Sequence, residues 1–139
     1  MNALSQGPFV IDHDQKLGGH GTLSYVSRRG FYTSWSVRHD SGLVVNPSDP
    51  ASVAADADFR DLLPYVDLAS NPPRARPRTI TDFSAGYTRS RDGGSRWEVA
   101  VQVSNLANRT ALYNFQSLFV GTRLVQPRTA GIRLRWYWR

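Results

Sequence analysis

The chain has 139 residues, of which 40% are hydrophobic and 20% charged, and this composition is typical of a folded protein. It contains no cysteine, which excludes a disulfide framework, a thiolate metal site and a cysteine nucleophile. The 17 Lys and Arg residues give a formal net charge of +6, but they are scattered and form no basic run of the kind that binds nucleic acid. We therefore expect no nucleic-acid partner.

Glycines and prolines separate segments of alternating polarity. The chain has 11 Gly and 8 Pro residues, and 12% of its residues are aromatic, which together favour an all-β fold. It has no run of about 20 apolar residues that could form a transmembrane helix, and residues 1–9 lack the charged and apolar regions of a secretory signal. A membrane-spanning β-strand needs only ~9–11 residues, half of them polar, and would escape such a search.

Two strands are predicted in the first part of the chain. Residues 1–16 show no sustained period and are expected to form a loop. Leu17–Ser27 and Phe31–Asp40 alternate between apolar and polar side chains, as strands with two different faces do. Arg28-Arg29-Gly30 lies between them and predicts a tight turn, because glycine readily adopts a positive φ. These segments should form a hairpin.

A long connection is predicted from Ser41 to Thr79. It is rich in Pro, Asp and Ala, and dipeptides such as Asn46-Pro47 are typical of loops. Within it, Ala54–Leu63 has apolar residues at helical spacing and is expected to form a short helix that ends at Pro64. Three arginines of this connection, which we expect to contact solvent or lipid headgroups, are Arg74, Arg76 and Arg78.

Three more strands are predicted in the second part of the chain. Ile80–Arg89 and Trp97–Asn105 alternate in polarity, and Asp92-Gly93-Gly94 between them predicts a second tight turn. Leu106–Arg128 is a second long connection. The final segment, Ile132–Arg139, alternates strictly up to the last residue. The connections between the five strands are therefore short, long, short and long.

This order of connections fits an outer-membrane barrel, which has short periplasmic turns and long extracellular loops. Residues 41–79 and 106–129 would be the extracellular loops. Aromatic residues on the apolar faces lie beside both short turns and at the end of the last strand, where barrels carry an aromatic girdle at the membrane interface. These predicted interface aromatics are Tyr25, Phe31, Tyr87, Trp97, Trp136 and Trp138.

The opposite faces of the same strands carry the charged residues. A charged Arg or Lys at the middle of a bilayer costs ~2–4 kcal/mol on the lipid side of a barrel strand, whereas the lumen tolerates charge. No Asp, Glu, Lys or Arg falls on the apolar face within Phe31–Val37, Phe83–Tyr87, Trp97–Val103 or Ile132–Trp138. The residues expected to face the lumen are Arg38, Asp40, Asp82, Glu98, Gln102, Arg133 and Arg135.

No motif in the sequence indicates catalysis or cofactor binding. Asp12-His13-Asp14 contains metal-ligand side chains, but neighbouring residues of an extended segment diverge, and a polar loop is the simpler interpretation. There is no nucleophile elbow and no glycine-rich loop placed between a strand and a helix. We therefore expect no enzymatic activity, no metal and no cofactor.

Four motifs follow one another in the second part of the chain. They are the segment Phe83–Tyr87, the strand Trp97–Ser104, the turn Asn105-Leu106-Ala107-Asn108 and the start of the last strand, Pro127-Arg128-Thr129. In this order they resemble the carboxyl-terminal end of TonB-dependent outer-membrane receptors. Such receptors have a barrel of about twenty-two strands and take up a scarce ligand with energy relayed from the inner membrane. The resemblance implies that the predicted strands are the last five of such a barrel.

The expected fold is therefore all-β: an antiparallel meander of about five amphipathic strands in a single region, 1–139, forming an incomplete piece of a transmembrane β-barrel. The resemblance implies a bacterial outer-membrane location. It also implies three partners: outer-membrane lipid, the remaining barrel and plug, and the TonB system through N-terminal parts that this sequence lacks. The alternative is a soluble antiparallel β module that binds carbohydrate or protein through its long loops. A soluble module should bury its apolar face, whereas a barrel piece should leave it outward.

Overall fold

A computed structural model describes residues 14–46, 49–90, 96–117 and 119–137. Its contacts divide the chain into two compact units. We call them the loop unit and the sheet unit. The loop unit is formed by the described residues of Met1–Gly18, Asp40–Arg78 and Ala111–Val125, and the sheet unit by those of Gly19–His39, Thr79–Thr110 and Gln126–Arg139.

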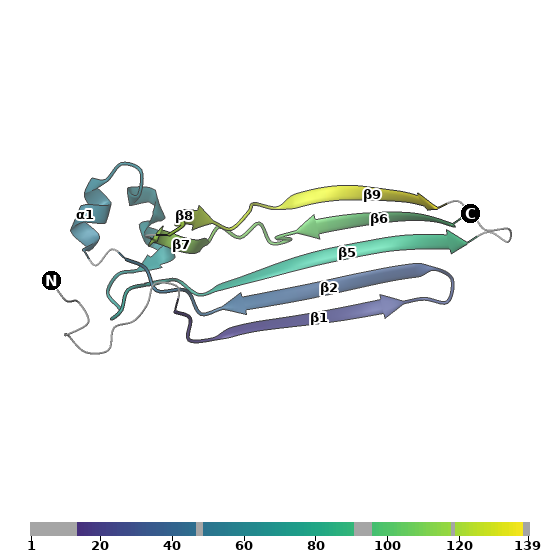
Figure 1. Cartoon of the computed structure of the whole chain (residues 1–139), viewed down its shortest axis with the longest axis horizontal. Coiled ribbons are helices and arrows are strands. Elements are labelled where there is room, and N and C mark those ends of the chain that lie inside the picture. The colour runs from purple at the N-terminus through teal and green to yellow at the C-terminus, as the bar shows by residue number, and fades with distance from the viewer. Residues whose placement is uncertain (1–13, 47–48, 91–95, 118, 138–139) are drawn as a thin grey trace. The chain divides into compact units, whose positions relative to one another are not determined.

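The sheet unit is built around one five-stranded sheet in the order β1-β2-β5-β6-β9. Figure 1 shows neighbouring arrows pointing in opposite directions, so the sheet is an antiparallel meander with β1 at one edge and β9 at the other. The predicted all-β meander is thus confirmed. The strands are β1 (Gly18–Val26), β2 (Phe31–Asp40), β5 (Arg78–Ser90), β6 (Arg96–Ser104) and β9 (Thr129–Tyr137).

The register gives the sheet one apolar and one polar face. Val101 lies opposite Ala85 on one side and Ile132 on the other, so apolar residues line up across three strands. Alternation along each strand places the intervening residues on the opposite side of the sheet. The apolar face comprises Leu23, Tyr25, Phe31, Trp35, Val37, Phe83, Ala85, Tyr87, Trp97, Val99, Val101, Val103, Ile132, Leu134 and Trp136.

The first tight turn forms where the sequence predicts it. The backbone N–H of Ser27 donates to the carbonyl of Phe31 at 2.7 Å, and Gly30 has a φ of 90°. A side chain at Gly30 would also collide with the carbonyl oxygen of Thr88 on β5. Glycine is required here both for its φ and for the close approach to β5. The second predicted turn, Asp92-Gly93-Gly94, lies outside the described residues.

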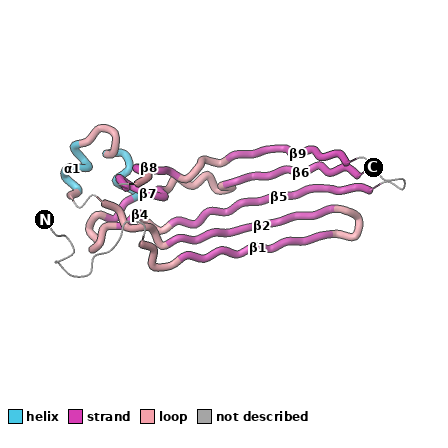
Figure 2. The backbone as a smooth tube through the Cα atoms, in the orientation of Figure 1, coloured by secondary structure: helices cyan, strands magenta, loops and turns pink. Residues whose placement is uncertain are grey.

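The two long connections contain more secondary structure than the one short helix that the sequence predicts (Figure 2). Their polypeptide forms the loop unit, which has short helices and short strand pairs. These elements are α1 (Pro50–Ala55), the 3-10 helix η2 (Arg60–Tyr65), β3 (Val66–Asp67), β4 (Arg74–Ala75), β7 (Leu112–Ser117) and β8 (Gly121–Leu124).

The prediction of a single helix over 54–63 is wrong, because two shorter helices, α1 and η2, occupy this region. The Asp49 carboxylate accepts hydrogen bonds from the backbone N–H groups of Ala51 and Ser52, so α1 begins at Pro50, earlier than the apolar spacing suggests. Proline is well tolerated at the first helical position. Pro64 lies inside η2 instead of ending a longer helix. None of the described helices is long and apolar enough to cross a membrane.

A hydrophobic core holds the loop unit together. Phe115 and Leu112 on β7 are each 1% exposed, and the ring of Phe59 meets that of Phe115 edge-on at 5.6 Å. Both long connections therefore contribute to one packed interior. Its buried residues are Val45, Val53, Val66, Ala75, Leu112 and Phe115.

Arg74 is buried, so the expectation that it contacts solvent or headgroups is wrong. One of its terminal nitrogens, Nη2, lies 2.9 Å from Oδ2 of Asp14, and the other, Nη1, donates to the Gly42 carbonyl at 3.3 Å. The charge is balanced by a partner that is 60 residues away in the sequence. Arg76, the second of the three arginines, is exposed, as expected. Asp14 thus serves an ion pair, while Asp12 and His13 lie outside the described residues.

Arg78 is also buried, so the expectation that it contacts solvent or headgroups is wrong as well. Its Nε lies 3.0 Å from Oδ2 of Asp40, and its Nη1 donates to the carbonyl of Leu112 at 2.6 Å. The guanidinium also lies 4.3 Å above the ring of Tyr113. Arg78 therefore connects the end of β2 with β7 inside the loop unit.

Candidate functional site

The polar face of the sheet contains a compact charged network centred on Glu98 of β6. The Tyr32 hydroxyl donates to Glu98 Oε1 at 2.7 Å, and Nη2 of Arg133 lies 3.0 Å from the same oxygen. Nη1 of Arg135 lies 3.9 Å from Oε2. Glu98 is only 8% exposed; the two arginines compensate its charge, and Tyr32 donates a hydrogen bond to it.

The geometry of this network follows from the register. Arg135 lies directly opposite Glu98, and Arg133 lies opposite Ala100, two residues further along the same face. Tyr32 comes from β2 and reaches Glu98 across the intervening strand β5. Gly86 makes this possible, because a side chain at Gly86 would collide with the ring of Tyr32.

The sequence predicted three members of this network on one face: Glu98, Arg133 and Arg135. It did not identify Tyr32 or Gly86. The available signal was a glycine within an otherwise regular strand, which often marks a close approach of another group.

Removing the Tyr32 hydroxyl should weaken the network. For Tyr32→Phe we expect a loss of about 1 kcal/mol in the free energy of unfolding, because one acceptor position of the Glu98 carboxylate loses its donor. The measurement is an equilibrium denaturant titration. The matched control is Tyr25→Phe, since Tyr25 is 59% exposed and its hydroxyl makes no hydrogen bond within the described part of the chain. Equal unfolding midpoints for both variants would contradict the assigned role.

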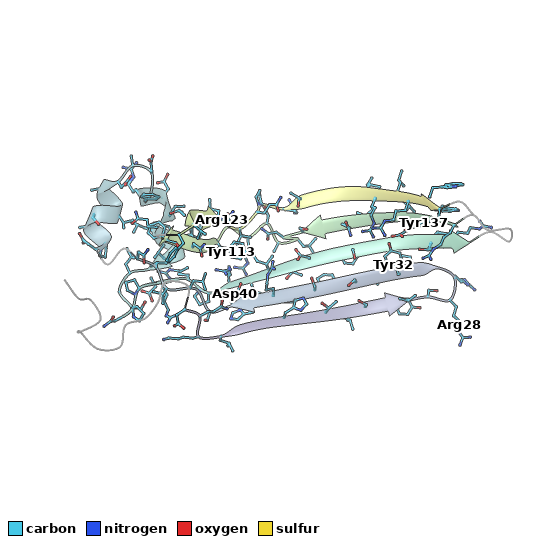
Figure 3. The ribbon with its side chains drawn as sticks, in the orientation of Figure 1. Arg28, Tyr32, Asp40, Tyr113, Arg123 and Tyr137 are labelled. Carbon is cyan, nitrogen blue, oxygen red and sulfur yellow. The ribbon has the colours of Figure 1, made fainter. Side chains whose placement is uncertain are left out.

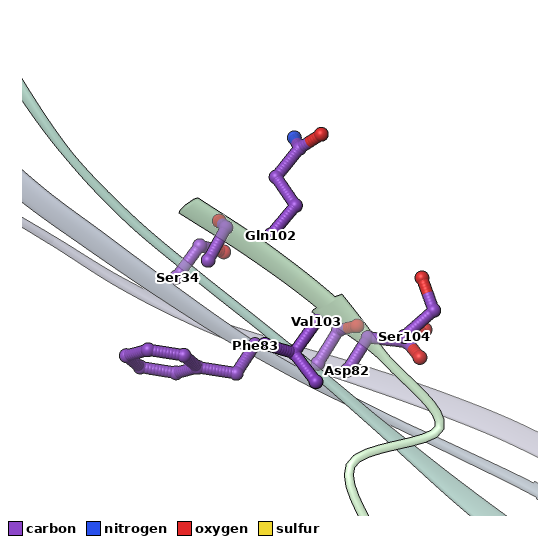
Figure 4. A pocket seen from close by; sticks show the side chains of 8 residues that line it. Ser34, Asp82, Phe83, Gln102, Val103 and Ser104 are labelled. Carbon is purple, nitrogen blue, oxygen red and sulfur yellow. The ribbon is translucent and has the colours of Figure 1, made fainter. Parts of the chain in front are cut away.

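A pocket of about 240 Å³ opens on the sheet and is rich in hydroxyl groups (Figure 4). Most of its side chains can donate and accept hydrogen bonds, which suits a polar ligand or ordered water. Asp82 is already engaged, because its Oδ1 accepts a hydrogen bond from the backbone N–H of Asn105 at 2.8 Å. The lining residues are Ser34, Ser36, Asp82, Phe83, Ser84, Gln102, Val103 and Ser104.

The predicted lumen-facing residues do not form a single site. Asp82 and Gln102 line the pocket. Arg38 is exposed near the end of β2, and Asp40 belongs to the loop unit, where it pairs with Arg78. Their position in a lumen remains a prediction. Among the described residues, no group of three or more His, Cys, Asp or Glu side chains is placed to hold a metal ion.

The apolar face of the sheet is uncovered within the sheet unit. Leu23 is 78% exposed, Leu134 76% and Ile132 74%. Trp35 is 45% exposed although its ring packs edge-on against Phe83 at 5.5 Å. Large apolar side chains on several neighbouring strands thus form one continuous exposed surface, which in proteins marks an interaction site.

The described interface aromatics lie at one end of this apolar face. Tyr25 and Phe31 flank the first turn, and the rings of Tyr87 and Trp97 lie 5.6 Å apart. Trp136 lies opposite Trp97 on the next strand. Trp138 lies outside the described residues. The structure therefore places these five aromatics on one face and at one end, while their contact with a membrane interface remains a prediction.

The turn Asn105-Leu106-Ala107-Asn108 ties the exit of β6 to the entry of β9. Asn105 and Asn108 both have a φ of 50°, a conformation that asparagine tolerates better than most residues. The Asn105 amide donates to the carbonyls of Arg109 and Gln126, at 2.9 Å each. Oδ1 of Asn108 accepts from the backbone N–H of Arg128 at 3.0 Å. The two asparagines thus fix where the last strand starts.

The comparisons with known proteins give no relative. No protein-family model, no curated protein and no solved structure matches the chain. The function must therefore be argued from the two faces of the sheet and from the motifs at its ends.

Proposed function

We propose that the chain forms part of the wall of a bacterial outer-membrane β-barrel of the TonB-dependent receptor type, which imports a scarce ligand with energy relayed from the inner membrane. The observation that carries the proposal is the apolar face of the sheet, which is continuous, free of charge in its centre and exposed.

Hydrocarbon is the environment that fits this face. Burying a large apolar side chain is worth about 1.5–3 kcal/mol, so a face with Leu23, Ile132 and Leu134 each more than two-thirds exposed is strongly unfavourable in water. Contact with lipid chains removes that cost. The polar face, with the Glu98 network and the hydroxyl-lined pocket, suits the water-filled or plug-filled interior of a barrel.

The two sheet edges support the same proposal. In the described sheet, β1 and β9 each have a neighbour on one side only. Such edges present unpaired backbone groups that pair with further strands in a closed barrel. The connections 41–79 and 106–129 leave the sheet at the end opposite the short turns. In this proposal they lie outside the cell and take part in ligand capture, and the loop unit's core would give them a fixed shape.

A soluble antiparallel β module that binds carbohydrate or protein is the second candidate. One observation favours it: the loop unit has its own hydrophobic core, as a soluble domain does. This candidate requires something other than lipid to cover the apolar face.

Tryptophan fluorescence distinguishes the two candidates. Trp35, Trp97 and Trp136 lie on the apolar face, so vesicles of brominated phosphatidylcholine should strongly quench the fluorescence of the refolded chain. In single-tryptophan variants, we expect bromine near the end of the acyl chains to quench Trp35 best, because Trp35 lies further from the turn end. Bromine near the headgroups should quench Trp97 best.

The control is the same chain in vesicles without bromine. Absence of quenching, together with a monomeric and cooperatively unfolding chain in detergent-free buffer, would overturn the barrel proposal and favour the soluble module. The assignment to the TonB-dependent receptor type has a separate test, which is to read the coding sequence upstream of Met1. We expect an in-frame extension that encodes further strands, a plug domain and an export signal. A different upstream architecture would overturn the receptor assignment and leave the barrel wall standing.

A further inference from the structure

Three exposed arginines lie at the turn end of the sheet unit. Arg28 and Arg29 form the turn after β1, where Figure 3 shows Arg28 at the tip. Arg89 lies at the end of β5, on the apolar face. We call these three residues the arginine belt.

Backbone contacts bring the members of the belt together. The N–H of Thr88 donates to the carbonyl of Gly30 at 2.8 Å, which holds the first turn against the end of β5. Arg89 lies one residue beyond Thr88 and opposite Trp97 of β6. The belt therefore extends from the turn between β1 and β2 to the end of the neighbouring strand β5.

The belt has an uncompensated positive charge. Within the part of the chain that the structure describes, none of its three guanidinium groups takes part in an ion pair. Glu98, the nearest acidic residue on β6, is buried and already engaged by Arg133 and Arg135. The connection 91–95 contains one Arg and one Asp in the sequence and so adds no net charge.

The belt lies next to the aromatic end of the apolar face. Phe31 directly follows the first turn, and Arg89 lies opposite Trp97 at the end of the apolar face. Aromatic residues of membrane proteins favour the headgroup level. With the apolar face in hydrocarbon, the guanidinium groups would lie at the depth of the lipid phosphates.

We propose that the arginine belt binds the phosphate groups of anionic phospholipids in the leaflet that faces the short turns. This inference rests on the proposed membrane-wall function and adds a lipid partner to it. Arginine suits the role because its planar guanidinium donates two parallel hydrogen bonds to a phosphate and remains charged at every physiological pH.

The test compares the full chain in two kinds of vesicle: phosphatidylcholine alone, and phosphatidylcholine with about one third phosphatidylglycerol. Each arginine near an anionic surface is expected to favour binding by roughly fivefold. Flotation should therefore show wild-type chain preferring the anionic vesicles by at least about tenfold. A variant with Arg28→Gln, Arg29→Gln and Arg89→Gln should lose most of this preference.

The matched control removes the same charge elsewhere, with Arg109→Gln, Arg123→Gln and Arg128→Gln, all at exposed positions. It should keep the preference. Equal losses in both variants, or no loss in the belt variant, would overturn the inference. Loss of the preference when inorganic phosphate replaces chloride at equal ionic strength would point to a free-phosphate site and overturn the lipid assignment.

Measuring insertion into phosphatidylcholine vesicles distinguishes a failure of this inference from a failure of the proposed function. A wild-type chain that does not insert there overturns the membrane-wall proposal itself. A belt variant that inserts there with the same β-sheet circular dichroism spectrum as the wild-type chain is folded. Its binding to anionic vesicles then tests the belt alone. The double variant Arg28→Gln, Arg29→Gln changes only an exposed turn and provides the same test should the triple variant misfold.

Discussion

Val101→Arg should make insertion of the chain into vesicles less favourable by about 2–4 kcal/mol, because it places a guanidinium in the middle of the lipid-facing surface. Val101 lies opposite Ala85 and Ile132, with apolar neighbours on both sides. The quantity to measure is the denaturant dependence of the inserted fraction. A much smaller loss would show that Val101, which is 44% exposed in the chain by itself, does not face hydrocarbon.

Gln102→Arg is the matched control. It introduces the same side chain one residue further along β6, on the polar face and at an exposed position. Since a barrel interior tolerates charge, its effect should stay below about 1 kcal/mol. Equal costs for the two variants would show that the faces do not differ in environment, and the membrane-wall proposal would then be wrong.

Phe115→Ala should destabilise the loop unit by about 3–5 kcal/mol, because it removes the largest fully buried side chain of that unit. The substitution also leaves Phe59 without its edge-on partner. Hydrogen exchange measured by mass spectrometry is a suitable readout, because it reports each peptide separately. Amides of residues 40–78 and 111–125 should lose protection, while those of β5 and β6 keep it.

Phe119→Ala provides the comparison, with the same chemical change at a side chain that is 79% exposed. Its effect should stay within about 0.5 kcal/mol. If both variants leave the exchange of residues 40–78 unchanged, the two long connections do not share a core, and the description of the loop unit would be refuted.

The five long strands could be predicted because each has its own signal. Phe31–Asp40 was predicted with the bounds that the structure has, and Trp97–Asn105 differs from β6 by one residue at each end. The side-chain period of a strand is two, so alternation over eight or more residues predicts both the element and its faces without knowledge of the neighbours.

The loop unit could not be predicted in the same way. Its strands have two to six residues, too few for a period to show. On β7, buried residues do not alternate with exposed ones, and its pairing with β8 shifts register twice. The core joins positions as distant as Val45 and Phe115, and burial of Arg74 depends on Asp14 60 residues away.

The same distinction between local patterns and long-range contacts applies to the candidate site. The sequence by itself determined the five amphipathic strands, the two faces and the placement of Glu98, Arg133 and Arg135 on one of them, because period-two alternation is a local property. Only the tertiary structure decided that Tyr32 reaches Glu98 over Gly86 and that the long connections share a core. Those contacts depend on register and on packing between segments far apart in the chain, which no local pattern encodes.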